Sequence, residues 1–123
     1  MESTLEVIHE YYKAFSTLDV NAIAPYYFEP STTVAPQGVL VAANRAALTA
    51  SLAPIINSLK ARGYGRSEFI EPRVTRLGET DALVRGVAVR YTSAGPELER
   101  VPLSYLLHRT DTSWKIAVLV VEQ

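Results

Sequence analysis

Apolar and polar residues alternate through the last third of the chain, and this pattern predicts three consecutive strands between residues 80 and 123. The alternation spans residues 83–91, 101–107 and 114–121, and no helical period interrupts it. Turn-forming residues at 78–81, 92–96 and 110–113 would fold these strands into an antiparallel meander. Both faces of the last strand are apolar, so we expect a sheet that needs cover on both sides.

Helical spacing dominates the first part of the chain. Ser3 and Glu6 form a capping-box pattern, and the apolar residues that follow at intervals of three and four predict a helix ending near residue 17. Asp19 is a favourable N-cap for a short second helix over residues 20–26. Two β-prone segments, 32–35 and 39–42, flank a Pro-Gln-Gly turn and predict a small hairpin or an edge strand.

The longest predicted helix begins after Asn44, a favourable N-cap, and ends near Gly63. Pro54 lies inside this helix and should bend it, because proline removes one backbone hydrogen bond. The predicted buried stripe of the helix consists of Leu48, Leu52, Ile55 and Leu59. A further strand is expected over residues 67–77, where Pro72 favours an edge position or a bulge.

The length of 123 residues is that of one domain, so we assign residues 1–123 to a single domain. Twelve basic and thirteen acidic residues nearly cancel and are spread along the chain, which argues against a nucleic-acid partner. The apolar runs are short and residues 1–10 contain three glutamates, so we expect no membrane partner and a cytoplasmic location. The chain has no cysteine, and His9 and His108 lack metal-site spacing, so we expect neither a metal nor another cofactor.

The element order of two helices, a hairpin, a long helix and antiparallel strands resembles that of the nuclear-transport-factor-2-like superfamily. The most local likeness, to bacterial ketosteroid isomerases, starts at Tyr11 with Y-x7-D-[VI]-x-A-I, includes Tyr27 and ends with T-V-x-P at residues 33–36. Polyketide cyclases of the SnoaL type share the general plan. The resemblance implies an α+β fold in which a cone-shaped, strongly bent mixed or antiparallel sheet wraps around helices and leaves a pocket at its open end.

By this resemblance, Tyr11 falls on the oxyanion-hole tyrosine of the isomerases and Tyr27 on a second pocket tyrosine. Tyr105 aligns with their second oxyanion donor, a protonated aspartate, if residues 110–113 contain a one-residue insertion. The aspartate that serves as their catalytic base is replaced by Ala35. An enolisation needs a group that removes a proton from carbon, and alanine has none, so steroid isomerisation by that mechanism is disfavoured.

If Tyr105 points inward, alternation places Val101, Leu103 and Leu107 inside with it. The pairing that the resemblance implies puts a row of the preceding strand on the same concave face, namely Leu83, Arg85, Val87, Val89 and Tyr91. The candidate ligand-binding residues are therefore three phenols and one cation in an apolar pocket, Tyr11, Tyr27, Arg85 and Tyr105. Alternatively, each tyrosine is a packed core aromatic, and Arg85 reaches the rim or pairs with Glu122 or a partner subunit.

Two functions of different classes fit such a pocket. The first is binding of a small hydrophobic molecule without catalysis, and the alternative is a cofactor-independent isomerase, cyclase or dehydratase that acts on a hydrophobic carbonyl compound. We place binding first because the sequence indicates the walls of a pocket and no base, so no catalytic residue is assigned. The outer face of the sheet has no predicted second helical layer, so we expect a homodimer through Val84, Ala88, Leu106, Ile116, Val118 and Val120.

Overall fold

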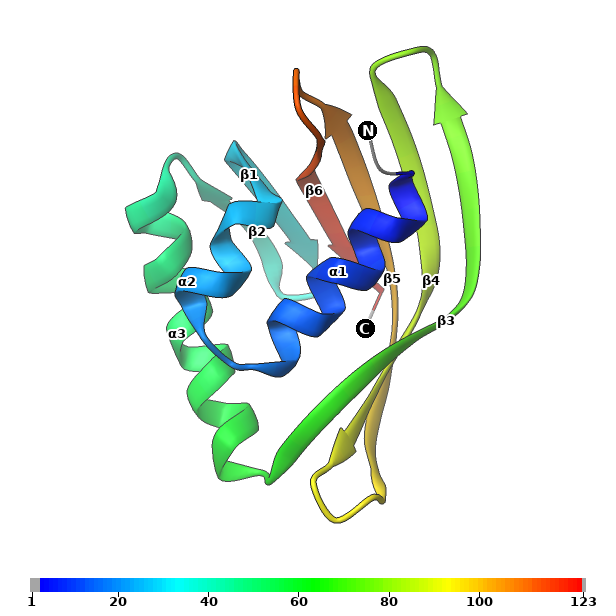
Figure 1. The fold of residues 1–123 in the computed structure, drawn as a ribbon. Coiled ribbons are helices and arrows are strands. Elements are labelled where there is room, and N and C mark those ends of the chain that lie inside the picture. Colours follow the sequence, from blue (N-terminus) through cyan, green and yellow to red (C-terminus); the bar gives the residue numbers. More distant parts are fainter. Residues whose placement is uncertain (1–2, 123) are drawn as a thin grey trace.

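The computed structural model describes residues 3–122, with helices concentrated early in the chain and strands later (Figure 1). The helical elements are α1 (Thr4–Ser16), α2 (Val20–Ile23), the 3-10 turn η1 (Ala24–Tyr26) and α3 (Arg45–Ala61). The strands are β1 (Tyr27–Ala35), β2 (Gly38–Ala42), β3 (Tyr64–Leu77), β4 (Asp81–Thr92), β5 (Glu97–Arg109) and β6 (Trp114–Val121). The predicted hairpin is the β1–β2 pair, and the predicted meander is β4, β5 and β6.

The six strands form one sheet in the order β2-β1-β6-β5-β4-β3. Neighbouring strands are antiparallel except β1 and β6, which run parallel, so the sheet is mixed. The sheet is strongly bent, and α1, α2 and α3 lie on its concave side (Figure 1). This is the predicted α+β architecture, a bent sheet wrapped around helices.

Local sequence signals account for where the elements begin and bend. Ser3 and Glu6 form the reciprocal capping box before α1, and the Asn44 side chain caps α3 by accepting a hydrogen bond from the backbone of Ala47. β3 is an edge strand, and its register with β4 shifts between Ile70 and Arg73, around Pro72. The prediction of an edge position or a bulge is thus correct on both counts.

The inward face of β4 differs from the predicted one. Tyr105 is paired directly with Val84, and directly paired residues share a face of the sheet. The concave row of β4 is therefore Ala82, Val84, Gly86, Ala88 and Arg90. The row predicted to face inward lies on the convex side, namely Leu83, Arg85, Val87, Val89 and Tyr91. Small residues face inward because aromatic rings fill the space above them: a Cβ on Gly86 would meet the Phe69 ring at 2.5 Å.

The outer face of the sheet also differs from the predicted one, because β6 contains a bulge. The β5–β6 register shifts between Leu106 and Leu107, so Val118 pairs with Leu106 on the convex side while Ile116 pairs with the buried Leu107. Ile116, Val84 and Ala88 are therefore core residues and cannot form an outer surface.

In α3 the buried stripe contains Ile56 instead of the predicted Ile55, whose side chain is 46 % exposed.

Candidate functional site

A cavity of about 590 Å³ lies between the concave face of the sheet, α1, α3 and the β1–β2 hairpin. Its volume falls within the range of about 300–1,000 Å³ that is typical of small-molecule sites. Apolar side chains from α3, β2 and the inner sheet face form much of the wall: Leu40, Leu48, Leu52, Ile55, Ala88, Val101, Leu103, Leu119 and Val121. Aromatic side chains from α1, β1 and β5 complete it: Tyr11, Tyr12, Phe15, Tyr27 and Tyr105.

Four of these aromatic residues form two hydrogen-bonded tyrosine pairs. The hydroxyl oxygens of Tyr11 and Tyr27 are 2.6 Å apart, and those of Tyr12 and Tyr105 are 2.8 Å apart. All four side chains are buried, and the ring centroids of Tyr11 and Tyr105 are 5.8 Å apart in an edge-to-face arrangement. Helix α1 contributes two consecutive tyrosines, which reach partners on two different strands, β1 and β5.

The tyrosine hydroxyls remain protonated near neutral pH. Burial raises the pKa of Tyr11 and of Tyr105 well above the ordinary value, and the hydroxyl partner raises each further. Burial also raises the pKa of Tyr12 and of Tyr27, although the hydrogen bond from the partner hydroxyl counteracts part of this increase. These groups can therefore donate hydrogen bonds as neutral phenols, and none of them brings a negative charge into the cavity.

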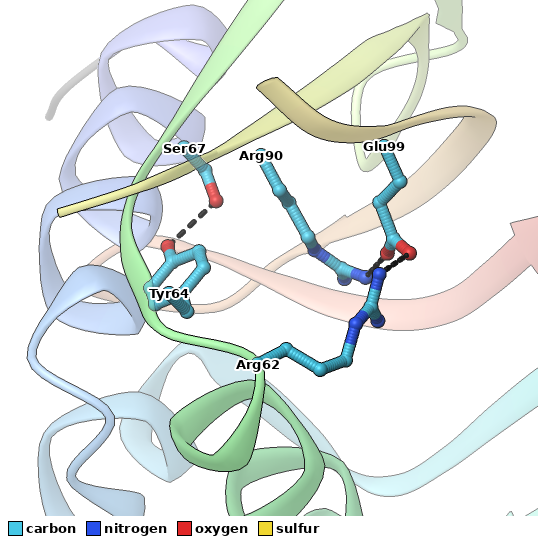
Figure 2. Close-up of polar contacts among 5 residues, drawn as sticks. All are labelled: Arg62, Tyr64, Ser67, Arg90 and Glu99. Atoms are coloured by element: carbon cyan, nitrogen blue, oxygen red, sulfur yellow. Dashed lines mark hydrogen bonds and ion pairs between the residues drawn. The ribbon is translucent and has the colours of Figure 1, made fainter. Parts of the chain in front are cut away.

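Charged side chains meet at the end of the cavity near α3 and the β4–β5 hairpin (Figure 2). Glu99 on β5 accepts hydrogen bonds from Arg90 on β4 and from Arg62, the C-cap residue of α3, at 2.7 Å for Arg62. The guanidinium of Arg90 also lies over the ring of Phe15, 5.6 Å from its centroid. Partial burial acts to raise the pKa of Glu99, but the two arginines outweigh it and hold that pKa below the ordinary value.

Neutral hydroxyl groups lie beside this charge cluster. The Tyr64 hydroxyl is 2.6 Å from the Ser67 Oγ on the next part of β3, and Ser67 lines the cavity (Figure 2). Ser16 at the end of α1 lies 3.3 Å from the same tyrosine hydroxyl. The wall near Arg90 therefore presents both charged and neutral polar groups.

Three of the four predicted site residues come together, and the fourth does not. Tyr11, Tyr27 and Tyr105 line one cavity, as the prediction of a shared cavity required. Arg85 lies on the convex face, where its Nη2 and Nε donate to Glu122 at 2.7 and 3.1 Å. The prediction that Arg85 faces the pocket is wrong because the row assigned inward in β4 was off by one residue, and the alternative pairing with Glu122 is the one observed.

The cavity also contains polar residues that the sequence analysis did not select. Tyr12 follows Tyr11 within the buried stripe of α1 and by position resembles an ordinary core aromatic. Its hydrogen bond with Tyr105 on β5 is what makes it part of the polar group in the cavity. Arg90 and Glu99 are direct neighbours across β4 and β5. Oppositely charged residues at paired positions of a hairpin are a signal that the sequence contains. The signal was missed because the row of β4 that includes Arg90 was predicted to face outward.

The two histidines lie away from the cavity. His9 lies beside a shallow groove with Lys13, and the Nδ1 of His108 is 2.9 Å from the Asp81 carboxylate on the sheet. Within residues 3–122, no group of three or more His, Cys, Asp or Glu side chains is placed to hold a metal ion. In the same described part of the chain, no helix combines the length and apolar character required to cross a membrane.

The fold and the cavity define a protein of the cystatin-like, nuclear-transport-factor-2-like class. The sequence matches the family described as NTF2-like protein (DUF6841) over residues 2–123, and the chain belongs to that family. None of the curated proteins compared with the sequence matches it.

Solved structures with the same fold are distant in sequence. A cystatin-like-fold protein from Nostoc punctiforme superposes with a TM-score of 0.80 at 11% identity, over 96% of this chain and 86% of that chain. An NTF2-like protein from Novosphingobium aromaticivorans gives 0.75 at 21% identity, over 95% and 77%. A candidate dehydratase of the NTF2-like family from Streptomyces avermitilis gives 0.71 at 18% identity, over 94% and 89%. At these identities the likeness establishes the fold alone.

Proposed function

We propose that the protein binds a small, largely apolar molecule that carries a hydrogen-bond acceptor. The observation that supports this most is the two buried tyrosine pairs lining the cavity. Each pair has two hydroxyl hydrogens, and only one of them can lie between the two oxygens. Each pair therefore retains one O–H group that can donate to a ligand oxygen, while the apolar wall favours a hydrophobic body.

A cofactor-independent isomerase, cyclase or dehydratase acting on a hydrophobic carbonyl compound is the second candidate. Two observations favour it: Glu99 is a carboxylate in the cavity wall, and one structural neighbour is a candidate dehydratase. A general base works best when its pKa is close to the working pH. The pKa of Glu99 is below its ordinary value, which makes this carboxylate a weak base and leaves binding as the first proposal.

A thermal-shift screen with apolar ketones, lactones, esters and carboxylic acids tests the binding proposal. A ligand present at about one hundred times its Kd should raise the free energy of unfolding by about 2.7 kcal/mol. Each hit is then titrated against the unmodified protein, Tyr105→Phe and the control Tyr91→Phe. Tyr91 lies on the convex side beneath Arg66, 4.2 Å from the ring centroid to the guanidinium carbon. Hits that bind both variants equally well would place the ligand outside the cavity and contradict the proposal.

We also propose that the protein forms a homodimer through the convex face. This surface, as the observed register defines it, contains apolar side chains of β4, β5 and β6: Leu83, Val87, Leu106, Val118 and Val120. All three α-helices lie on the opposite side of the sheet, so another copy of the chain is the simplest cover for this row (Figure 1). Sedimentation velocity at micromolar concentration measures the assembly state, and a single monomeric species would contradict the proposal.

A further inference from the structure

The charged part of the cavity wall has more positive than negative groups. Arg90 and Glu99 line the cavity, and Arg62 pairs with Glu99 from beside it. Together these three side chains comprise two cations and one anion. The four tyrosines of the cavity are neutral, so they do not cancel the remaining positive charge.

The surplus positive charge belongs to two arginines that share Glu99, and Arg90 is the one of the two that lines the cavity. Glu99 uses one carboxylate oxygen for Arg62 and the other for Arg90, so a single carboxylate is shared by two guanidinium groups. Of the three residues, Arg90 has the least exposed side chain, 21% against 27% for Glu99 and 41% for Arg62. A guanidinium has five N–H donors, and the contact of Arg90 with Glu99 uses only Nη1, so Arg90 can hold a second acceptor.

The charged side chains occupy one part of the cavity wall, whereas the neutral polar residues Thr33, Gln37 and Ser51 come from β1, the β1–β2 turn and α3. The charge cluster and Ser67 lie near α3's end and the β4–β5 hairpin (Figure 2), while Leu40, Leu52 and Leu119 belong to β2, α3 and β6. A ligand that fills the cavity would therefore meet a charged group at one part of its surface and hydrocarbon over much of the rest. This distribution suits an amphipathic molecule better than a uniformly apolar one.

We propose, building on the small-molecule function above, that the ligand is an apolar carboxylate whose charged head binds against Arg90 and whose hydrocarbon or aromatic body packs on the apolar wall. A planar carboxylate matches the fork of N–H donors on a guanidinium. One negative charge also balances the single surplus positive charge of the cluster. A cationic ligand would meet this surplus unfavourably, and a neutral ligand would leave it unbalanced.

Matched acids and amides test the proposal directly. The probes are 4-phenylbutyrate, 1-naphthylacetate and decanoate, each compared with its primary amide, which has nearly the same shape and no charge. Binding is measured by calorimetry at low and at moderate salt. We expect at least one carboxylate to bind about tenfold or more tightly than its amide, with a preference that decreases as salt is added.

Three variants assign the preference to this cluster. Arg90→Gln should remove about tenfold of the carboxylate affinity and leave the amide nearly unchanged. Glu99→Gln should tighten carboxylate binding, because it removes the competing negative charge and releases both arginines. Arg85→Gln, which alters the similar pair on the convex face, is the matched control and should change neither affinity. Circular dichroism and thermal melting confirm that each variant is folded.

The outcomes separate this inference from the function on which it rests. Carboxylate preference that disappears in Arg90→Gln and increases in Glu99→Gln supports the inference. Amides that bind as tightly as their acids, or acids whose affinity Glu99→Gln lowers in a folded protein, overturn it while leaving small-molecule binding intact. If neither acids nor amides bind, and the wider thermal-shift screen gives no ligand, both the inference and the proposed function are overturned.

Discussion

Strand β4 carries two arginine–glutamate pairs on opposite faces of the sheet, and their surroundings differ. On the convex face, Arg85 and Glu122 form a two-point contact with one cation and one anion, and the Arg85 side chain is 58% exposed. On the concave face, Arg90 lies over Phe15 and shares Glu99 with a second arginine. The same residue types therefore make a balanced, solvated pair on one side and a positively charged wall of a cavity on the other.

This difference shows that the layer covering the sheet, and not the residue type, determines what an ion pair can do. An exposed pair gains little because water and salt screen both charges. A pair under a helical layer keeps stronger electrostatic interactions and can act on a ligand in the same space. Most apolar residues follow the same division: Leu107 on the concave side is fully buried, whereas the apolar side chains of the proposed dimer surface are only partly buried. Val89 is the exception, because it is fully buried although it belongs to the convex row.

The largest difference should appear in the core beneath the helices. Leu107→Ala should lower the free energy of unfolding by about 2–5 kcal/mol, because it leaves a void in a fully buried position. Leu77→Ala is the control at a leucine that is 47% exposed and should cost less than about 1 kcal/mol. Urea denaturation of the two variants measures both values. Equal losses would mean that the concave side is not the main core.

The assembly of the chain should depend on the convex side alone. Val118→Glu places a charge in the proposed dimer surface and should weaken association by more than about tenfold, or cause aggregation. Val74→Glu is the control, because Val74 pairs with the inward-facing Val84 and is 40% exposed at the edge strand. Sedimentation of both variants at micromolar concentration distinguishes them. If Val118→Glu sediments like the unmodified protein, the convex face is not the interface.

Glu99 and Glu122 should also differ in how much they contribute to the stability of the fold. Glu99→Gln should lower the free energy of unfolding at neutral pH by about 1–2 kcal/mol, because two arginines lose their charged partner. Glu122→Gln, in the more exposed pair, should cost between about 0 and 1 kcal/mol. Chemical denaturation at several pH values measures both effects.

The pH dependence of the Glu99 effect has a definite sign. The folded-state pKa of Glu99 is lowered from 4.5, so its ionised form stabilises the fold at pH values above 4.5. This contribution is lost as the pH falls from 4.5 through the folded-state pKa. The difference between the unmodified protein and Glu99→Gln should therefore shrink in that window, and a difference that grows on acidification would contradict the assignment.

The sequence was sufficient for the architecture and for part of the site. Capping residues, helical stripes and turn residues predicted the element order, and Pro72 predicted the edge strand and its bulge. The aromatic members of the site followed from the resemblance at Tyr11, Tyr27 and Tyr105. The element predictions depend on local patterns, and Tyr11 and Tyr27 belong to one local motif, whereas Tyr105 depended on an assumed insertion in residues 110–113. All three line the cavity, and their role in binding stays a prediction.

The remaining features depend on strand register, which alternation alone does not determine. Both rows of β4 are largely apolar, so alternation did not distinguish them, and the inward row was taken from the pairing that the resemblance implied. The observed register instead places Gly86 and Ala88 inward, beneath the rings of the core. A one-residue error exchanged Arg85 for Arg90 as the cation of the cavity. The bulge in β6 similarly moved Ile116 to the inside, and no residue in that stretch signals it.

The smallest expected effect concerns the phenols, and it separates binding from catalysis. Once a ligand is known, Tyr11→Phe and Tyr105→Phe each remove one hydroxyl from a buried pair, whereas Tyr91→Phe removes one from the convex side. A hydrogen bond to a passively bound neutral acceptor contributes about 0.5–1.5 kcal/mol, so binding should weaken about two- to twelvefold in the first two variants. Tyr91→Phe should bind as the unmodified protein does.

Larger effects on turnover would indicate an enzyme. A donor that stabilises charge developing on an oxygen typically contributes about 3–4 kcal/mol to the transition state, which is a loss of about a hundredfold or more in kcat. Calorimetry and, where product forms, kcat are therefore measured on the same three variants. A loss of kcat much larger than the loss of affinity in Tyr11→Phe or Tyr105→Phe would reverse the order of the two proposed functions. Losses within the range of a single neutral hydrogen bond would keep binding as the first proposal. The phenols would then bind the ground state and the transition state equally well and would not accelerate a reaction.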